Sequence, residues 1–137
     1  MLHEDTPDAT EFRVRAIGHV RTDVPDAEVP RRRRDLVSDI VVLPDYAPGL
    51  AGIEEYSQLI VLFYMDRSPH GGALQTHPRG DASLPLTGVF ATRGRAHPNP
   101  IGLAVVDLLA RDDCVLTVRR LDAWHGTPVI DIKPYDH

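Results

Sequence analysis

The residues best placed to do chemistry lie in one proline-rich stretch, residues 87–102. Four polar side chains follow one another there, those of Arg93, Arg95, His97 and Asn99. Pro98 and Pro100 fix their own φ angles and push the residue before each of them out of the helical region, so this segment is extended and stiff. Because they lack N–H groups, the segment is also excluded from the middle of a sheet. A stiff loop with polar side chains is typical of a binding site, with a plain turn between two strands as the alternative.

Further polar residues follow expected strands, and they could meet this stretch at one end of a sheet. They are Asp66, Arg67, Asp122, Asp131, Lys133 and Tyr135. There is also a run of four arginines, Arg31, Arg32, Arg33 and Arg34. That run is either a solvated loop or an anion site, because guanidinium groups match the oxygens of phosphates and carboxylates. Spacing alone does not bring these side chains together, and each is also compatible with a solvated loop position.

Several other kinds of chemistry find no support in the sequence. The seven histidines include no pair at metal-binding spacing, and there is a single cysteine, so no metal site is expected. That cysteine, Cys114, and the serines lack the sequence context of an activated nucleophile. No glycine-rich loop has the spacing that binds nucleotide phosphates or a dinucleotide.

Short apolar runs separated by Gly and Pro dominate the chain. Strands are predicted at residues 12–20, 36–43, 59–65, 89–92, 103–109, 114–121 and 129–132. The run 59–65 is apolar throughout, which predicts a core strand buried on both faces. Residues 66–85 have almost no apolar pattern, which is typical of a functional or mobile loop. The pattern predicts a mostly β protein, a small barrel of about seven short strands with few short helices.

Composition limits the domain organisation and the setting of the protein. The chain has 137 residues, which predicts a single domain over residues 11–137 after a frayed, acidic segment at residues 1–10. The net charge of −5 argues against a protein that binds nucleic acid by bulk charge. A single cysteine allows no disulfide within the chain and favours the cytoplasm. The longest apolar run, at residues 59–65, is too short to span a membrane.

Three motifs in order resemble the signature of one known family. They are Gly-Val-Phe-Ala-Thr-Arg at residues 88–93, Pro-Asn-Pro-Ile-Gly at residues 98–102, and Gly-Thr-Pro-Val-Ile-Asp-Ile-Lys-Pro-Tyr at residues 126–135. Shorter matches lie at residues 17–21, 52–57 and 77–80, so the likeness covers nearly the whole chain. The chain is identified as a member of the TsaA-like family, also called tRNA methyltransferase O.

The resemblance implies a small β-barrel that binds S-adenosylmethionine without a Rossmann fold, as a homodimer with the cofactor near the subunit interface. In the family, the best-known reaction methylates N6 of a threonylcarbamoyl-adenosine beside the tRNA anticodon. Carried over by motif, the cofactor-contacting positions are Asp66, Arg67, Arg93, Leu103, Arg120, Leu121 and Asp122. A guanidinium suits the methionine carboxylate, and Leu103 and Leu121 are expected to enclose the adenine. No catalytic residue is assigned, and the candidates are Asn99, Asp131 and Tyr135.

The chain departs from the family pattern at the edges of these motifs. Gly94 and Arg95 replace a common Ser-Pro, His97 replaces an arginine, and His125 replaces an aspartate. The C-terminal domain of longer relatives is expected to be absent, since the sequence stops shortly after Tyr135. The resemblance makes a methyltransferase that acts on tRNA, with contacts from Arg31 to Arg34, the first hypothesis. A methyltransferase with a small-molecule acceptor, a non-catalytic S-adenosylmethionine-binding module and an anion- or RNA-binding domain remain open.

Overall fold

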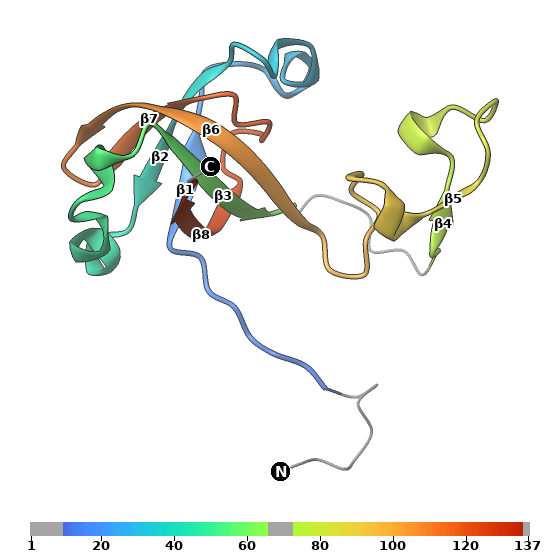
Figure 1. Cartoon of the computed structure of the whole chain (residues 1–137), viewed down its shortest axis with the longest axis horizontal. Coiled ribbons are helices and arrows are strands. Elements are labelled where there is room, and N and C mark those ends of the chain that lie inside the picture. The colour runs from blue at the N-terminus through green and yellow to red at the C-terminus, as the bar shows by residue number, and fades with distance from the viewer. Residues whose placement is uncertain (1–9, 66–72, 136–137) are drawn as a thin grey trace.

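A closed antiparallel barrel forms the centre of the molecule (Figure 1). The computed structural model describes residues 10–65 and 73–135. The barrel strands are β1 (Gly18–Arg21), β2 (Val37–Val42), β3 (Gln58–Tyr64), β6 (Ile101–Asp112), β7 (Val115–Arg119) and β8 (Pro128–Pro134). Their order around the barrel is β1-β2-β7-β6-β3-β8, and β8 pairs with β1 to close it. The predicted mostly β barrel is confirmed, with six strands in the closed barrel and not seven.

Alternating side chains on the strands fill the barrel interior. In β3, Leu59, Val61 and Phe63 are buried while the residues between them are only partly buried. The prediction that this run is buried on both faces is therefore wrong, because a closed barrel has a single interior face. β2 and β7 follow the same alternation, with Ile40, Val42, Leu116 and Val118 inside.

Short 3-10 helices connect the strands. They are η2 (Asp26–Glu28), η3 (Pro30–Arg32), η4 (Pro44–Leu50), η5 (Ile53–Glu55), η6 (Pro78–Gly80) and η7 (Val89–Ala91). Proline begins η3, η4 and η6, where its fixed φ suits the first turn and its missing N–H breaks no internal hydrogen bond. Within the part of the chain that the structure describes, no helix is long and apolar enough to cross a membrane.

Residues 73–100 project from the barrel between β3 and β6, and we call them the arm (Figure 1). The arm carries β4 (Gln75–Thr76) paired with β5 (Thr87–Gly88), together with η6 and η7. Within the predicted loop 66–85, residues 75–76 and 78–80 form β4 and η6, while residues 66–72 lie outside the described part. The backbone N–H of Met65 donates to the carbonyl of Pro100 at 2.7 Å, which closes the base of the arm.

Two strand predictions fail where a local pattern had no partner strand. Residues 12–17 are not in a strand, and Phe12 and Val14 remain largely exposed, so only the end of the predicted strand 12–20 pairs as β1. The predicted strand 89–92 is mostly the 3-10 helix η7. There the Thr92 hydroxyl and backbone N–H both donate to the carbonyl of Val89, at 2.9 and 3.0 Å, which favours a turn over an extended backbone.

The backbones of β1 and β2 approach each other closely at Gly18, and a substitution there tests this packing. A Cβ at Gly18 would overlap the carbonyl oxygen of Val41 and lie 3.0 Å from the Cα of Val42, and both are backbone atoms of the neighbouring strand. We expect Gly18→Ala to lower the free energy of unfolding by about 1–3 kcal/mol in urea denaturation. The control is Gly88→Ala, because Gly88 has φ −62° and ψ 141° and open space around it. Equal stability of the two variants would contradict this packing.

Candidate functional site

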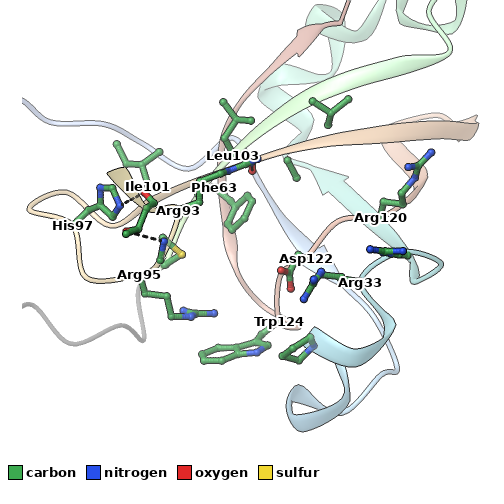
Figure 2. A pocket seen from close by; sticks show the side chains of 18 residues that line it. Arg33, Phe63, Arg93, Arg95, His97, Ile101, Leu103, Arg120, Asp122 and Trp124 are labelled. Carbon is green, nitrogen blue, oxygen red and sulfur yellow. Dashed lines mark hydrogen bonds between the residues drawn. The ribbon is translucent and has the colours of Figure 1, made fainter. Parts of the chain in front are cut away.

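A cavity of about 590 Å³ lies between the barrel, the turn after η3 and the base of the arm (Figure 2). Its lining combines several arginines, one carboxylate, one histidine and a set of apolar side chains. The lining residues are Pro30, Arg33, Arg34, Phe63, Met65, Thr92, Arg93, Gly94, Arg95, His97, Ile101, Gly102, Leu103, Ala104, Val105, Arg120, Asp122 and Trp124. The volume lies within the range of about 300–1,000 Å³ that is typical of small-molecule sites.

The start of β6 forms the apolar wall of the cavity. Gly102 pairs with Phe63 of β3, and the Phe63 ring occupies the space that a side chain at Gly102 would need. Gly102 is buried there, while its neighbours Ile101 and Leu103 are 46% and 47% exposed. The sequence Ile-Gly-Leu therefore turns two apolar side chains outward, where a ligand can contact them.

The arm supplies the wall opposite the barrel. The guanidinium of Arg93 donates from Nη2 to the carbonyl of Leu103 at 2.6 Å, which joins the arm to β6. The ring Nε2 of His97 donates to the carbonyl of Thr92 at 3.0 Å and holds the loop in a compact shape. The predicted exclusion of Pro98 and Pro100 from the sheet is confirmed, since β6 begins only at Ile101.

An arginine–tryptophan contact crosses between the arm and the barrel. The guanidinium carbon of Arg95 lies 3.9 Å from the centre of the Trp124 ring (Figure 2). The positive charge over the ring face makes a cation–π contact. Arg95 replaces a residue of the common family pattern, so this contact depends on a departure from that pattern.

Asp107 holds the arginines at the end of β7. Its carboxylate accepts from Arg119 Nε at 3.0 Å, from Arg120 Nε at 3.2 Å and from Gln58 Nε2 at 3.1 Å. The pKa of Asp107 lies below its ordinary value: desolvation by burial acts to raise it, but the hydrogen bonds from Gln58, Arg119 and Arg120 outweigh burial. Arg120 has a φ of 81°, in the left-handed region that non-glycine residues rarely adopt. Asp107 therefore stabilises the one cavity arginine whose backbone is strained.

The family model of the tRNA-methyltransferase O N-terminal domain matches residues 19–137. The chain belongs to the tRNA-methyltransferase O N-terminal domain family. This confirms the resemblance that the three sequence motifs carry.

Relatives of this chain are named for S-adenosyl-L-methionine binding or for tRNA methylation. A "Probable S-adenosyl-L-methionine-binding protein" of Archaeoglobus fulgidus is 48% identical over 97 residues, which are 71% of this chain and 26% of that protein. A protein of the same description from Methanothermobacter thermautotrophicus is 40% identical over 91% of this chain and 90% of its own length. The "tRNA (adenine(37)-N6)-methyltransferase" of Escherichia coli is 34% identical over 92% of this chain and 58% of its own length.

Solved structures of the tRNA-methyltransferase O family share the fold. TrmO from Pseudomonas aeruginosa superposes with a TM-score of 0.74 at 30% identity, over 96% of this chain and 57% of that chain. Another TrmO crystal structure gives a TM-score of 0.72 at 31% identity, over 93% of this chain and 58% of that chain. The chain therefore spans little more than half the length of these solved structures.

The structure brings together part of the residue set carried over from the family motifs. Arg93, Leu103, Arg120 and Asp122 all line the cavity. Leu121 does not line it, because its side chain is completely buried in the barrel core. Asp66 and Arg67 lie outside the described residues.

The three catalytic candidates lie elsewhere in the fold. Asn99 lines a second hollow beside residues 10–16 and not the cavity. Asp131, on β8, accepts from its neighbouring N–H and forms an ion pair with Lys133 at 3.0 Å. Tyr135 follows β8 and donates its backbone N–H to Gln58. Among the described residues, no group of three or more His, Cys, Asp or Glu side chains is arranged to hold a metal ion.

Sequence reasoning did not place Phe63, Trp124 or the second half of the arginine run at the cavity. Phe63 belongs to the predicted core strand 59–65, and Trp124 lies in none of the sequence motifs. Arg33 and Arg34 were indistinguishable from Arg31 and Arg32 in sequence. The one available signal was that Trp124 is the single tryptophan, two residues after a predicted site residue.

The contribution of the Asp107 carboxylate to stability should depend on pH, and the variant Asp107→Asn tests this. The lowered folded-state pKa means that Asp107 stabilises the fold at neutral pH and loses this effect as pH falls through that folded-state value. We expect the variant to be less stable than wild type by about 1 kcal/mol at neutral pH. The difference should shrink below about pH 4, near the unfolded value. Urea denaturation across pH measures this, with the exposed Asp23→Asn as control, and a difference independent of pH would contradict it.

Proposed function

We propose that this chain is the cofactor-binding barrel of an S-adenosylmethionine-dependent methyltransferase that acts on an adenosine of tRNA. The observation that carries the proposal is the cavity, which combines guanidinium groups, a carboxylate and exposed apolar side chains in one place. Family membership and the names of the relatives support the same activity. By resemblance, the acceptor is N6 of threonylcarbamoyl-adenosine.

The cavity residues fit the polar end of S-adenosylmethionine. Arg93 would bind the methionine carboxylate, because its hydrogen bond to Leu103 leaves further N–H donors of the guanidinium for a ligand. Asp122 would face the ammonium or the sulfonium, since its carboxylate forms no ion pair with any described residue. The carboxylate of the methionine moiety and one of its two positive groups would thus each have a partner of opposite sign.

The apolar residues fit the other end of the cofactor. Leu103, half-exposed on β6, would pack against the adenine as first expected. Leu121 is buried in the core, so Ile101 or the Trp124 ring would take the place proposed for it on the second face. Asp66 and Arg67, proposed from the motif, directly follow Met65 of the cavity lining in sequence.

Positioning accounts for the chemistry that this site can perform. The cofactor supplies, when bound, a methyl group made electrophilic by the sulfonium. The chain's own residues would fix the orientation of both reactants for an in-line displacement and keep water out of the cavity. None of Asn99, Asp131 and Tyr135 lines the cavity, so we propose no general base from among them within one chain.

A homodimer would complete this site. The arm exposes Phe90, Leu74 and Leu86, which are 78%, 60% and 54% exposed. Exposed apolar residues gathered on one projecting segment mark an interaction surface. We propose that a second copy covers the arm, with the cofactor close to the interface as the family resemblance implies.

The alternative functions can be distinguished by whether S-adenosylmethionine is consumed. The relatives from Archaeoglobus fulgidus and Methanothermobacter thermautotrophicus are named only as binding proteins, which favours a non-catalytic module as the second candidate. Both candidates bind S-adenosylmethionine, but only an enzyme releases S-adenosylhomocysteine when an acceptor is added. Release with a metabolite, and none with tRNA, would indicate the small-molecule acceptor.

Arg93→Ala should weaken S-adenosylmethionine binding by about ten-fold or more, because a charge-assisted hydrogen bond is lost. Arg93→Lys should fall between this variant and wild type, since the charge remains without the planar fork. Calorimetry measures the affinity. The control is Arg21→Ala, which removes an arginine of β1 that pairs with Asp39 and does not line the cavity. Unchanged affinity in folded Arg93→Ala would remove Arg93 from the site.

The arm should control the oligomeric state. We expect wild type to be a dimer at micromolar concentration and Phe90→Asp to raise the dimer dissociation constant by about 100-fold or more, because a charge would be buried in an apolar contact. Phe90→Leu, which keeps an apolar side chain, should remain dimeric. Light scattering after size-exclusion chromatography measures both. A wild-type monomer with full cofactor affinity would overturn the proposed interface.

A further inference from the structure

We propose that Arg33 and Arg34 form a subsite for backbone phosphates of the RNA acceptor at the edge of the cavity. This inference rests on the proposed function and assigns one half of the arginine run to a specific task. Arg31 and Arg32, in the same run, are not part of the subsite.

The structure divides the four consecutive arginines into two pairs. Arg33, labelled in Figure 2, and Arg34 line the cavity, whereas Arg31 and Arg32, in η3, do not. All four side chains are exposed. The two pairs therefore share charge, solvent exposure and sequence neighbourhood, and differ in their position relative to the cavity.

A well-anchored turn carries the lining pair. Val29 before the run and Leu36 after it are 1% and 0% exposed, so both ends of the turn are buried. The N–H of Leu36 donates to the carbonyl of Arg32 at 2.8 Å. The N–H of Arg120 donates to the carbonyl of Leu36, also at 2.8 Å, which ties the turn to the end of β7. Arg33 and Arg34 thus start from a fixed backbone, which lowers the entropy lost when an anion is bound.

The charge of the cavity exceeds what the proposed cofactor requires. Among the residues that the structure describes, five arginines line it, and Asp122 is the single acidic one. S-adenosylmethionine itself carries one carboxylate against two positive groups, so it can neutralise at most one of these guanidinium groups. The surplus predicts a second, anionic ligand beside the cofactor.

Other contacts already account for part of the arginine set. Arg120 is paired with Asp107, and Arg95 lies over Trp124. Arg93 is the arginine proposed for the cofactor carboxylate. Arg33 and Arg34 form no ion pair with a described residue, so their charge is the part left to an acceptor.

The chemistry of the pair fits phosphodiester oxygens. Guanidinium groups bind phosphate through two parallel N–H···O bonds, and two adjacent arginines can contact successive phosphates of one strand. An exposed position at the cavity edge suits a backbone, which must pass outside the cavity while the reactive base enters it. A net charge of −5 for the whole chain then makes a local cationic pair more important for binding RNA.

The test compares two double variants with the same loss of charge, Arg33→Ser/Arg34→Ser and Arg31→Ser/Arg32→Ser. The probe is an anticodon stem-loop RNA, and fluorescence anisotropy gives its affinity between about 50 and about 200 mM KCl. We expect the Arg33/Arg34 variant to bind at least about ten-fold more weakly and to flatten the salt slope by roughly 1.4–1.8, the value for two phosphate contacts. The Arg31/Arg32 variant should lose less than about three-fold, as expected for charges that act only at a distance.

Three results would overturn the subsite. Equal losses in the two variants would indicate diffuse attraction without a defined site. Unchanged RNA affinity and salt slope in the Arg33/Arg34 variant would exclude phosphate contacts. Lower methylation with an unchanged slope would assign the pair to a carboxylate of the acceptor base or to a small anionic metabolite.

Calorimetry with S-adenosylmethionine separates this inference from the proposed function. Wild type that binds no cofactor contradicts the proposed function, whatever the RNA data show. Wild type that binds the cofactor and releases S-adenosylhomocysteine, with both double variants binding RNA equally, contradicts only the subsite. A circular dichroism spectrum and a urea unfolding midpoint equal to those of wild type show that the Arg33/Arg34 variant is folded.

Discussion

The close packing of the Phe63 ring over Gly102 is the contact on which the site depends. The ring fills the space where any other residue at position 102 would place its side chain, so β3 and β6 can pair with Phe63 opposite Gly102. This register sets Ile101 and Leu103 outward and places Met65 next to the base of the arm. The apolar wall of the cavity and the attachment point of the arm therefore follow from one aromatic–glycine pair.

Electrostatics then distinguishes the two sides of the cavity. On the arm side, Arg93 donates to a carbonyl and Arg95 contacts an aromatic ring. On the barrel side, Asp107 compensates Arg119 and Arg120, while Arg33 and Arg34 stand on a separate turn. Such a site can bind a zwitterion and an anion together, because the cationic groups are distributed over three different elements of the chain.

The barrel could be predicted well from the sequence, because short apolar runs mark its strands. The site could be predicted only in part. The continuous apolar run of β3 marks a strand but does not show that only one of its faces lies inside the barrel. Phe12 and Val14 follow a strand-like alternation without a partner strand, and Thr92 forms a hydrogen-bonded turn, so both local patterns misled. Arg93, Leu103, Arg120 and Asp122 were found through motif resemblance. The Arg95–Trp124 contact and the division of the arginine run depend on how distant segments meet, and no spacing in the sequence encodes that.

The hydrogen bond between Met65 and Pro100 has a consequence for how members of the family can diverge. It holds the two ends of the intervening segment together at one point of the barrel rim. A segment anchored in this way can be lengthened, shortened or replaced at small entropic cost, because the ends stay where they are and the strand register does not change. Evolution can thus exchange the arm, and with it the surface proposed to meet a second copy, while it keeps the barrel intact, as antibodies vary loops on a constant framework.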